Sequence, residues 1–220
     1  MSLLRSRFFQ ISAGFVSGAC IMLSLLIFFR PGLSEPTGSV VVSPVPSPGV
    51  SETPDNVSLY LSAAGVAASL YAGDYSALSS WVSQESGLMF VPFSTVEFDR
   101  NLVFTPIEVK GFADNKNTYL WGVEPGTGVR LERTPAQFTD ETLRTLDYSQ
   151  ASVIGIRRVM KTGNAPENVA EAFQDGYFVD FYYPPSEQGG TDWSSLKVVF
   201  ANENGRLRLI ALVRGVYTAQ

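Results

Sequence analysis

Few residues of this chain are suited to acid–base or nucleophilic chemistry, because its 220 residues include no histidine and one cysteine. The serine–histidine and cysteine–histidine mechanisms are therefore excluded. The run Ser194–Lys197 (SSLK) matches S-x-x-K and the run Lys161–Gly163 matches K-T-G, two motifs of penicillin-recognising serine enzymes. In those enzymes the nucleophile opens a helix, whereas this S-x-x-K enters a predicted strand, which places Ser194 and Lys197 on opposite faces. Because the order of the motifs is also reversed, we reject this mechanism.

Carboxylates are the remaining candidates for catalysis. Four of them lie near one another in the sequence: Asp175, Asp180, Glu187 and Asp192. A pair of carboxylates can act as general acid and base, so an enzyme with a carboxylate base stays an alternative. Acidic side chains beside strands and turns are more often solvated or capping, and a zinc site made of carboxylates alone is unusual. We therefore expect no catalytic residue, no metal site and no cofactor.

The acidic balance of the chain argues against nucleic acid as a partner. The formal charge is −5, and residues 1–58 carry three basic and three acidic side chains, so the negative charge lies on residues 59–220. Binding to nucleic acid depends on lysine and arginine that neutralise phosphates. We expect no nucleic-acid partner.

An apolar segment near the N-terminus predicts a membrane anchor within residues 1–30. The segment from Phe8 to Phe29 has 22 residues and no charge, and a helix of that length reaches roughly 33 Å, enough to cross a bilayer core of about 30 Å. Arg5 and Arg7 precede it, and the positive-inside rule then leaves the N-terminus in the cytoplasm. The sequence thus predicts a single-pass protein of the cell membrane, with its C-terminal domain outside the cytoplasm.

Two features of this segment suggest further roles. Gly14 and Gly18 form a GxxxG pattern, which can bring two membrane helices together as a homodimer. Cys20 ends a weak lipoprotein box, with Ser17 where an aliphatic residue is usual. Lipidation of Cys20 is the alternative to an uncleaved anchor, and either one holds the domain at a membrane.

A proline-rich linker joins the anchor to one domain. Residues 31–58 contain six prolines among small and polar residues, and proline supports neither a sheet ladder nor a helix interior. We expect a semi-extended linker at 31–58 and a domain at 59–220.

The domain should combine helices with antiparallel strands. Apolar spacing predicts a helix over 59–71 and a second one capped by Asp74, and Thr-Pro or Ala-Pro runs predict helix starts at 105–108, 134–137 and 164–167. Predicted strands cover 88–93, with Pro92 favouring a sheet edge, and 118–123, 129–133, 152–160, 177–183, 196–201 and 207–213. Asn204-Gly205 predicts a tight hairpin between the last two. The fold class is α+β with a mainly antiparallel sheet.

The sequence resembles a group of uncharacterised extracytoplasmic bacterial proteins, lipoprotein-like or membrane-anchored, with an NTF2-like (cystatin-like) domain. The resemblance lies in the runs Phe178–Phe181 (FVDF), Asp192–Phe200 (DWSSLKVVF) and Leu209–Val213 (LIALV), together with Leu102–Thr105 and Tyr119–Gly122. It implies a cone-shaped domain with a curved sheet, and no activity. In such a cone, Trp121, Tyr182 and Trp193 would line the concavity. Together with Asp180, they are our candidate ligand-facing residues, although core packing explains the same rings.

The expected function is a membrane-tethered, non-catalytic extracytoplasmic module that binds a protein partner or an envelope ligand. One alternative is an NTF2-like enzyme that uses a carboxylate base. The other alternative is a structural subunit of an envelope complex, held in place through Gly14 and Gly18.

Overall fold

The computed structural model describes residues 53–218 of the chain. The predicted membrane span over 8–29, the contacts at Gly14 and Gly18, and Cys20 lie outside this range. Among residues 53–218, none of the helices is both long and apolar enough to span a membrane. All of the structure described below belongs to one compact unit of the chain.

Two helices open the domain. Helix α1 spans Asn56–Ala72 and begins earlier than the predicted Leu59, because the Asp55 carboxylate accepts hydrogen bonds from two amides of the first turn. Gly73 caps its C-terminus with a left-handed φ of 68°, which glycine readily adopts. Asp74 caps helix α2 (Tyr75–Trp81) as predicted.

The main sheet has six strands in the order β2-β1-β8-β7-β6-β5. Their bounds are Leu88–Val91 (β1), Leu102–Phe104 (β2), Val153–Ile156 (β5), Tyr177–Tyr183 (β6), Ser194–Glu203 (β7) and Arg206–Val216 (β8). Every pairing is antiparallel except β1 with β8, which is parallel. Strands β3 (Tyr119–Val123) and β4 (Arg130–Arg133) form a separate hairpin. The predicted α+β class with a mainly antiparallel sheet is confirmed.

The prediction that Pro92 places its strand at an edge is wrong. Strand β1 lies between β2 and β8, and it ends at Val91, so Pro92 follows the strand and removes no donor from the ladder. The tight turn between β7 and β8 is confirmed, with left-handed φ values of 54° at Asn204 and 79° at Gly205.

Two of the three predicted helix starts are confirmed, and the third is wrong. Thr105 and Thr134 each form a full capping box, at the start of α3 (Pro106–Lys110) and α4 (Pro135–Phe138). The last short helix, α5 (Val169–Ala172), begins after the predicted start at 164–167. The Asn164 amide instead bonds to the backbone of Thr218, at 2.7 and 3.0 Å, and is not available as a cap.

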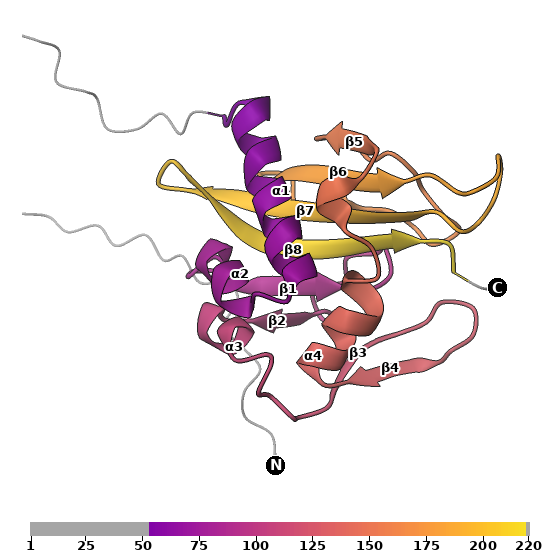
Figure 1. The fold of residues 1–220 in the computed structure, drawn as a ribbon, viewed down its shortest axis with the longest axis horizontal. Helices are drawn as coiled ribbons and strands as arrows, with labels where there is room; N and C mark the ends of the chain where they lie inside the picture. Colours follow the sequence, from indigo (N-terminus) through magenta and orange to yellow (C-terminus); the bar gives the residue numbers. More distant parts are fainter. Residues whose placement is uncertain (1–52, 219–220) are drawn as a thin grey trace, which may run out of the picture. The chain divides into compact units, whose positions relative to one another are not determined.

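The sheet has two differently covered faces. The inner face, which carries Val179, Phe181, Leu196 and Val198, packs against α1 and the other N-terminal helices in the larger apolar core. In Figure 1, α1 crosses this face of the sheet. The outer face carries alternate residues of the same strands and a smaller apolar cluster. Val159, Val169 and Ala172, which follow β5 in the chain, belong to this cluster or pack against it. Asn168, in the same segment, bonds to both backbone groups of Val96.

Candidate functional site

A cavity opens on the inner face beside the first residues of β7 and the last residues of β8. The strand register pairs Leu196 with Arg214 and Ser194 with Val216, so Arg214 follows the last core residue of β8 on this face. The cavity measures about 370 Å³. It is lined by Phe93, Glu124, Thr145, Leu146, Thr191, Asp192, Trp193, Ser194, Arg214, Val216, Tyr217 and Thr218. We call it the Arg214 cavity. Its volume is in the range of sites for small molecules.

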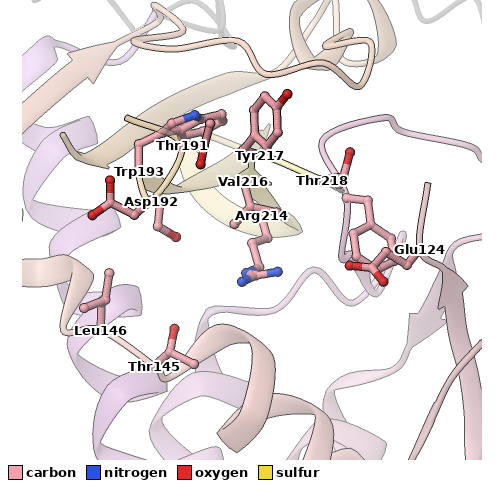
Figure 2. Close-up of a pocket in the computed structure, with 12 residues that line it drawn as sticks. Glu124, Thr145, Leu146, Thr191, Asp192, Trp193, Arg214, Val216, Tyr217 and Thr218 are labelled. Carbon is pink, nitrogen blue, oxygen red and sulfur yellow. The ribbon is translucent and has the colours of Figure 1, made fainter. Parts of the chain in front are cut away.

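Arg214 supplies a fixed positive charge to this cavity. Figure 2 shows its guanidinium directed into the space between Thr145, Leu146 and Glu124. Burial lowers the pKa of this group, whereas its hydrogen bond with the Tyr148 hydroxyl and the charge of Glu124 raise it. An arginine keeps its charge throughout the physiological range. Within residues 53–218, the Arg214 Nε is buried without a hydrogen-bond partner, and the ion pairs within 4.0 Å involve other side chains.

Two carboxylates flank this cation at longer range. The Asp192 carboxylate accepts hydrogen bonds from the hydroxyl and the amide of Ser186, at 2.6 and 3.2 Å, and these bonds lower its pKa. Glu124 accepts a hydrogen bond of 2.6 Å from the Thr127 hydroxyl, in the turn after β3. Both carboxylates are thus oriented by their own neighbours, and a carboxylate with two partners retains further acceptor positions.

The Ser194 hydroxyl, which lines the cavity, is not paired with a general base that could activate it as a nucleophile. Ser194 and Tyr148 share a hydrogen bond of 2.6 Å. Burial is the largest influence on Tyr148 and raises its pKa, so the phenol is neutral at physiological pH and a weak base. The arrangement favours recognition of a charged ligand over covalent chemistry.

A second polar cluster lies on the outer face and is fully enclosed. The Lys197 Nζ lies 2.7 Å from the Glu167 Oε2 and 3.3 Å from the Ser195 Oγ. Asp180, on the neighbouring strand, accepts a hydrogen bond of 2.8 Å from the amide of Met160. Asp180, Ser195 and Lys197 are all 0% exposed. We call these residues the buried lysine cluster.

The buried lysine cluster contains the residue types of many active sites, but its side chains are buried as in a protein core. Burial raises the pKa of Asp180, opposed by the charge of Lys197, and a perturbed carboxylate of this kind is typical of catalytic residues. Because Asp180, Ser195 and Lys197 have no exposed surface, we interpret the cluster as part of the core packing. Ser194 and Lys197 lie on opposite faces, as predicted, since Ser194 contacts Tyr148 on the inner face. Sequence reasoning missed the pair Ser195 and Lys197, although their i, i+2 spacing in a strand places them on one face.

Gly215 makes room for this cluster. A Cβ at Gly215 would lie 2.5 Å from the Ser195 Oγ and 3.0 Å from the Lys197 Nζ. We expect Gly215→Ala to reduce the free energy of unfolding by about 1–3 kcal/mol, as overpacking of a core does. Urea denaturation measures the loss. As a control, Gly111→Ala adds a Cβ whose nearest atoms lie at 3.6 and 3.7 Å, an ordinary contact distance, at a φ of −89°. An unchanged midpoint for Gly215→Ala would contradict the close packing of the cluster.

The candidate ligand-facing residues lie in different places. Trp193 is 3% exposed and lines the Arg214 cavity, but its ring packs over Gly163 and Gly215. Trp121 is in the core: it is 1% exposed, its ring stacks on Phe138 at 3.8 Å, and its Nε1 donates to the Arg133 carbonyl. This is the core packing that we weighed as its alternative.

The remaining candidates do not meet at the cavity either. Asp180 belongs to the buried lysine cluster, and the ring of Tyr182 lies 6.2 Å from that of Trp193. Of the four carboxylates close in sequence, Asp192 lines the cavity, while Asp175 and Glu187 are exposed at the surface. Sequence reasoning missed Arg214 as a binding residue. The sequence feature that could have indicated it is the position of Arg214, a charged residue directly after the apolar run from Leu209 to Val213.

Neither a protein-family model nor a curated protein sequence matches the chain. A solved structure that is similar to it is the crystal structure of an NTF-2 like protein of unknown function from Shewanella oneidensis MR-1. The two are 11% identical, and the match covers 73% of this chain and 97% of that chain with a TM-score of 0.31.

Proposed function

We propose that this protein is a membrane-tethered, non-catalytic binding module whose NTF2-like domain is held outside the cytoplasm and takes a small ligand in the Arg214 cavity. The helix over 8–29 would anchor it, and the linker over 31–58 would separate the domain from the bilayer. The element order, the mainly antiparallel sheet and the helix across its inner face support the NTF2-like assignment.

One observation supports this function best: Arg214 is a half-buried cation whose Nε has no hydrogen-bond partner and which lacks a carboxylate within 4.0 Å, among residues 53–218. Removing a charge from water is costly unless the charge is paired and hydrogen-bonded. A protein that retains such a charge at the end of a cavity has a donor ready for an incoming anionic group. Arginine is well suited to this role, because its planar fork can bind a carboxylate through two parallel hydrogen bonds.

The expected result is a saturable, Arg214-dependent response to small carboxylates. Full-length protein in detergent would be titrated with acetate, benzoate and succinate, and with acetamide and benzamide as uncharged counterparts, while the thermal midpoint is measured. At least one carboxylate should raise the midpoint, and the amides should not. Arg214→Gln should weaken this binding by at least tenfold, because the bidentate contact is lost.

Arg206→Gln is the matched control, since Arg206 is an exposed arginine on the same strand. Its titration should match that of the unmodified protein. If no carboxylate shifts the midpoint, or if Arg214→Gln binds as tightly as the unmodified protein, the proposed function is wrong.

A further inference from the structure

The charges around the Arg214 cavity restrict what can occupy it. The carboxylates of Glu124 and Asp192 also line the cavity, and Figure 2 shows them on opposite sides of the Arg214 side chain. A ligand that carries only negative charge is attracted by Arg214 and repelled by both carboxylates, and a dianion such as phosphate is disfavoured most. A ligand with one anionic and one cationic group matches the cavity at both ends.

The two carboxylates are suited to bind a cation. Asp192 is ionised and fixed by its bonds to Ser186, which hold its pKa below the usual range. Glu124 is partly buried and is fixed by Thr127. An ammonium group carries three donors and no acceptor, so it satisfies carboxylate oxygens that the protein leaves with acceptor capacity.

The rest of the lining is apolar or neutral. Phe93, Leu146 and Val216 supply hydrocarbon, and Thr145 supplies a hydroxyl group beside Leu146. A volume of about 370 Å³ is at the small end of ligand sites, so the occupant is compact. The ring of Trp193 packs against Gly163 and Gly215, on the outer face, and thus does not present a stacking plane for a sugar to this cavity.

We propose that the Arg214 cavity binds a free α-amino acid with an apolar side chain. The carboxylate pairs with Arg214, the ammonium group with Asp192 or Glu124, and the side chain contacts Phe93, Leu146 and Val216. This inference rests on the proposed function, because it names the ligand of the same cavity. It requires that both charged groups of the ligand contribute to binding.

Isothermal titration of the full-length protein in detergent tests this requirement. The probes are L-leucine and L-phenylalanine, then N-acetyl-L-leucine, which lacks the ammonium group, L-leucinamide, which lacks the carboxylate, and glucuronate, an acidic sugar. We expect saturable binding of leucine or phenylalanine. Blocking either charged group should weaken binding by at least tenfold, since each contact involves a charge-assisted hydrogen bond.

Variants of the two carboxylates separate this inference from the proposed function. In the double variant Glu124→Gln/Asp192→Asn, the preference for leucine over N-acetyl-leucine should fall by at least fivefold, while Arg214-dependent binding of carboxylates persists. Asp175→Asn, an exposed position away from the cavity, is the control and should bind as the unmodified protein does.

Three outcomes would overturn the inference. If N-acetyl-leucine binds as tightly as leucine, the cavity is a plain carboxylate site and the proposed function stands. If glucuronate binds and the amino acids do not, the ligand is an acidic sugar, and again the proposed function stands. If leucine and phenylalanine show no saturable binding, the inference fails, and the titration of Arg214→Gln with simple carboxylates decides whether the proposed function fails with it.

Discussion

Replacing Lys197 with methionine should lower the free energy of unfolding by about 3–5 kcal/mol, the usual loss when one partner of a buried ion pair is removed. Lys197 is 0% exposed, and its partner Glu167 is 6% exposed at the side chain. Without the ammonium group, the Glu167 carboxylate is left enclosed without its partner. Asp180 also loses the nearby positive charge that opposes the effect of its own burial.

The double variant Lys197→Met/Glu167→Gln should regain part of the lost stability, because neither residue then carries a buried charge. The exposed Lys161→Met is a control for the loss of a lysine and should change the free energy of unfolding by less than about 0.5 kcal/mol. Urea denaturation midpoints with an unchanged slope measure these differences. A Lys197→Met protein as stable as the unmodified one would show that the pair contributes nothing.

Replacing Trp121 with alanine should cost about 3–5 kcal/mol of stability, as expected when a large aromatic residue is removed from a core. The ring of Trp121 lies within 5.5 Å of the rings of Phe90, Phe104 and Phe138, measured between centroids. Its indole N–H satisfies the carbonyl of Arg133 at 2.9 Å. Alanine would leave both a cavity and a partly buried carbonyl without its indole donor.

Two further variants distinguish a core residue from a ligand-facing one. Leu120→Ala is the control on the same strand and should cost much less, since Leu120 is 37% exposed. Trp121→Phe should stay folded and bind carboxylates as the unmodified protein does. If Trp121→Phe loses binding while its thermal midpoint is unchanged, Trp121 contacts the ligand after all.

The features that the sequence predicts best are those that depend on neighbouring residues. The capping boxes at Thr105 and Thr134 each close within three residues of the chain, and the turn at Asn204-Gly205 depends on two residues that tolerate left-handed backbone. Alternation in β7 also predicts correctly that Ser194 and Lys197 lie on opposite faces.

The features that the sequence fails to predict depend on distant contacts. Asn164 and Glu167 have the composition of a helix start, yet one bonds to Thr218 and the other to Lys197. The role of Arg214 is hidden for a similar reason. Alternation along β8 places Arg214 on the inner face, but the loop that carries Thr145 and Leu146 decides whether that end of the face is open. Local patterns hold no information about the position of that loop.

The position of β8 in the middle of the sheet has a consequence for how the protein is made. β8 is the last strand along residues 53–218, and it alone joins β1 and β2 to the strands β7, β6 and β5. As the ribosome delivers the chain, these two parts of the sheet emerge with unpaired edges and stay separate until the final strand arrives. Pairing of segments so distant in sequence makes folding slow. Arg214 belongs to that strand, so a nascent chain acquires its cavity only at the moment when its sheet closes.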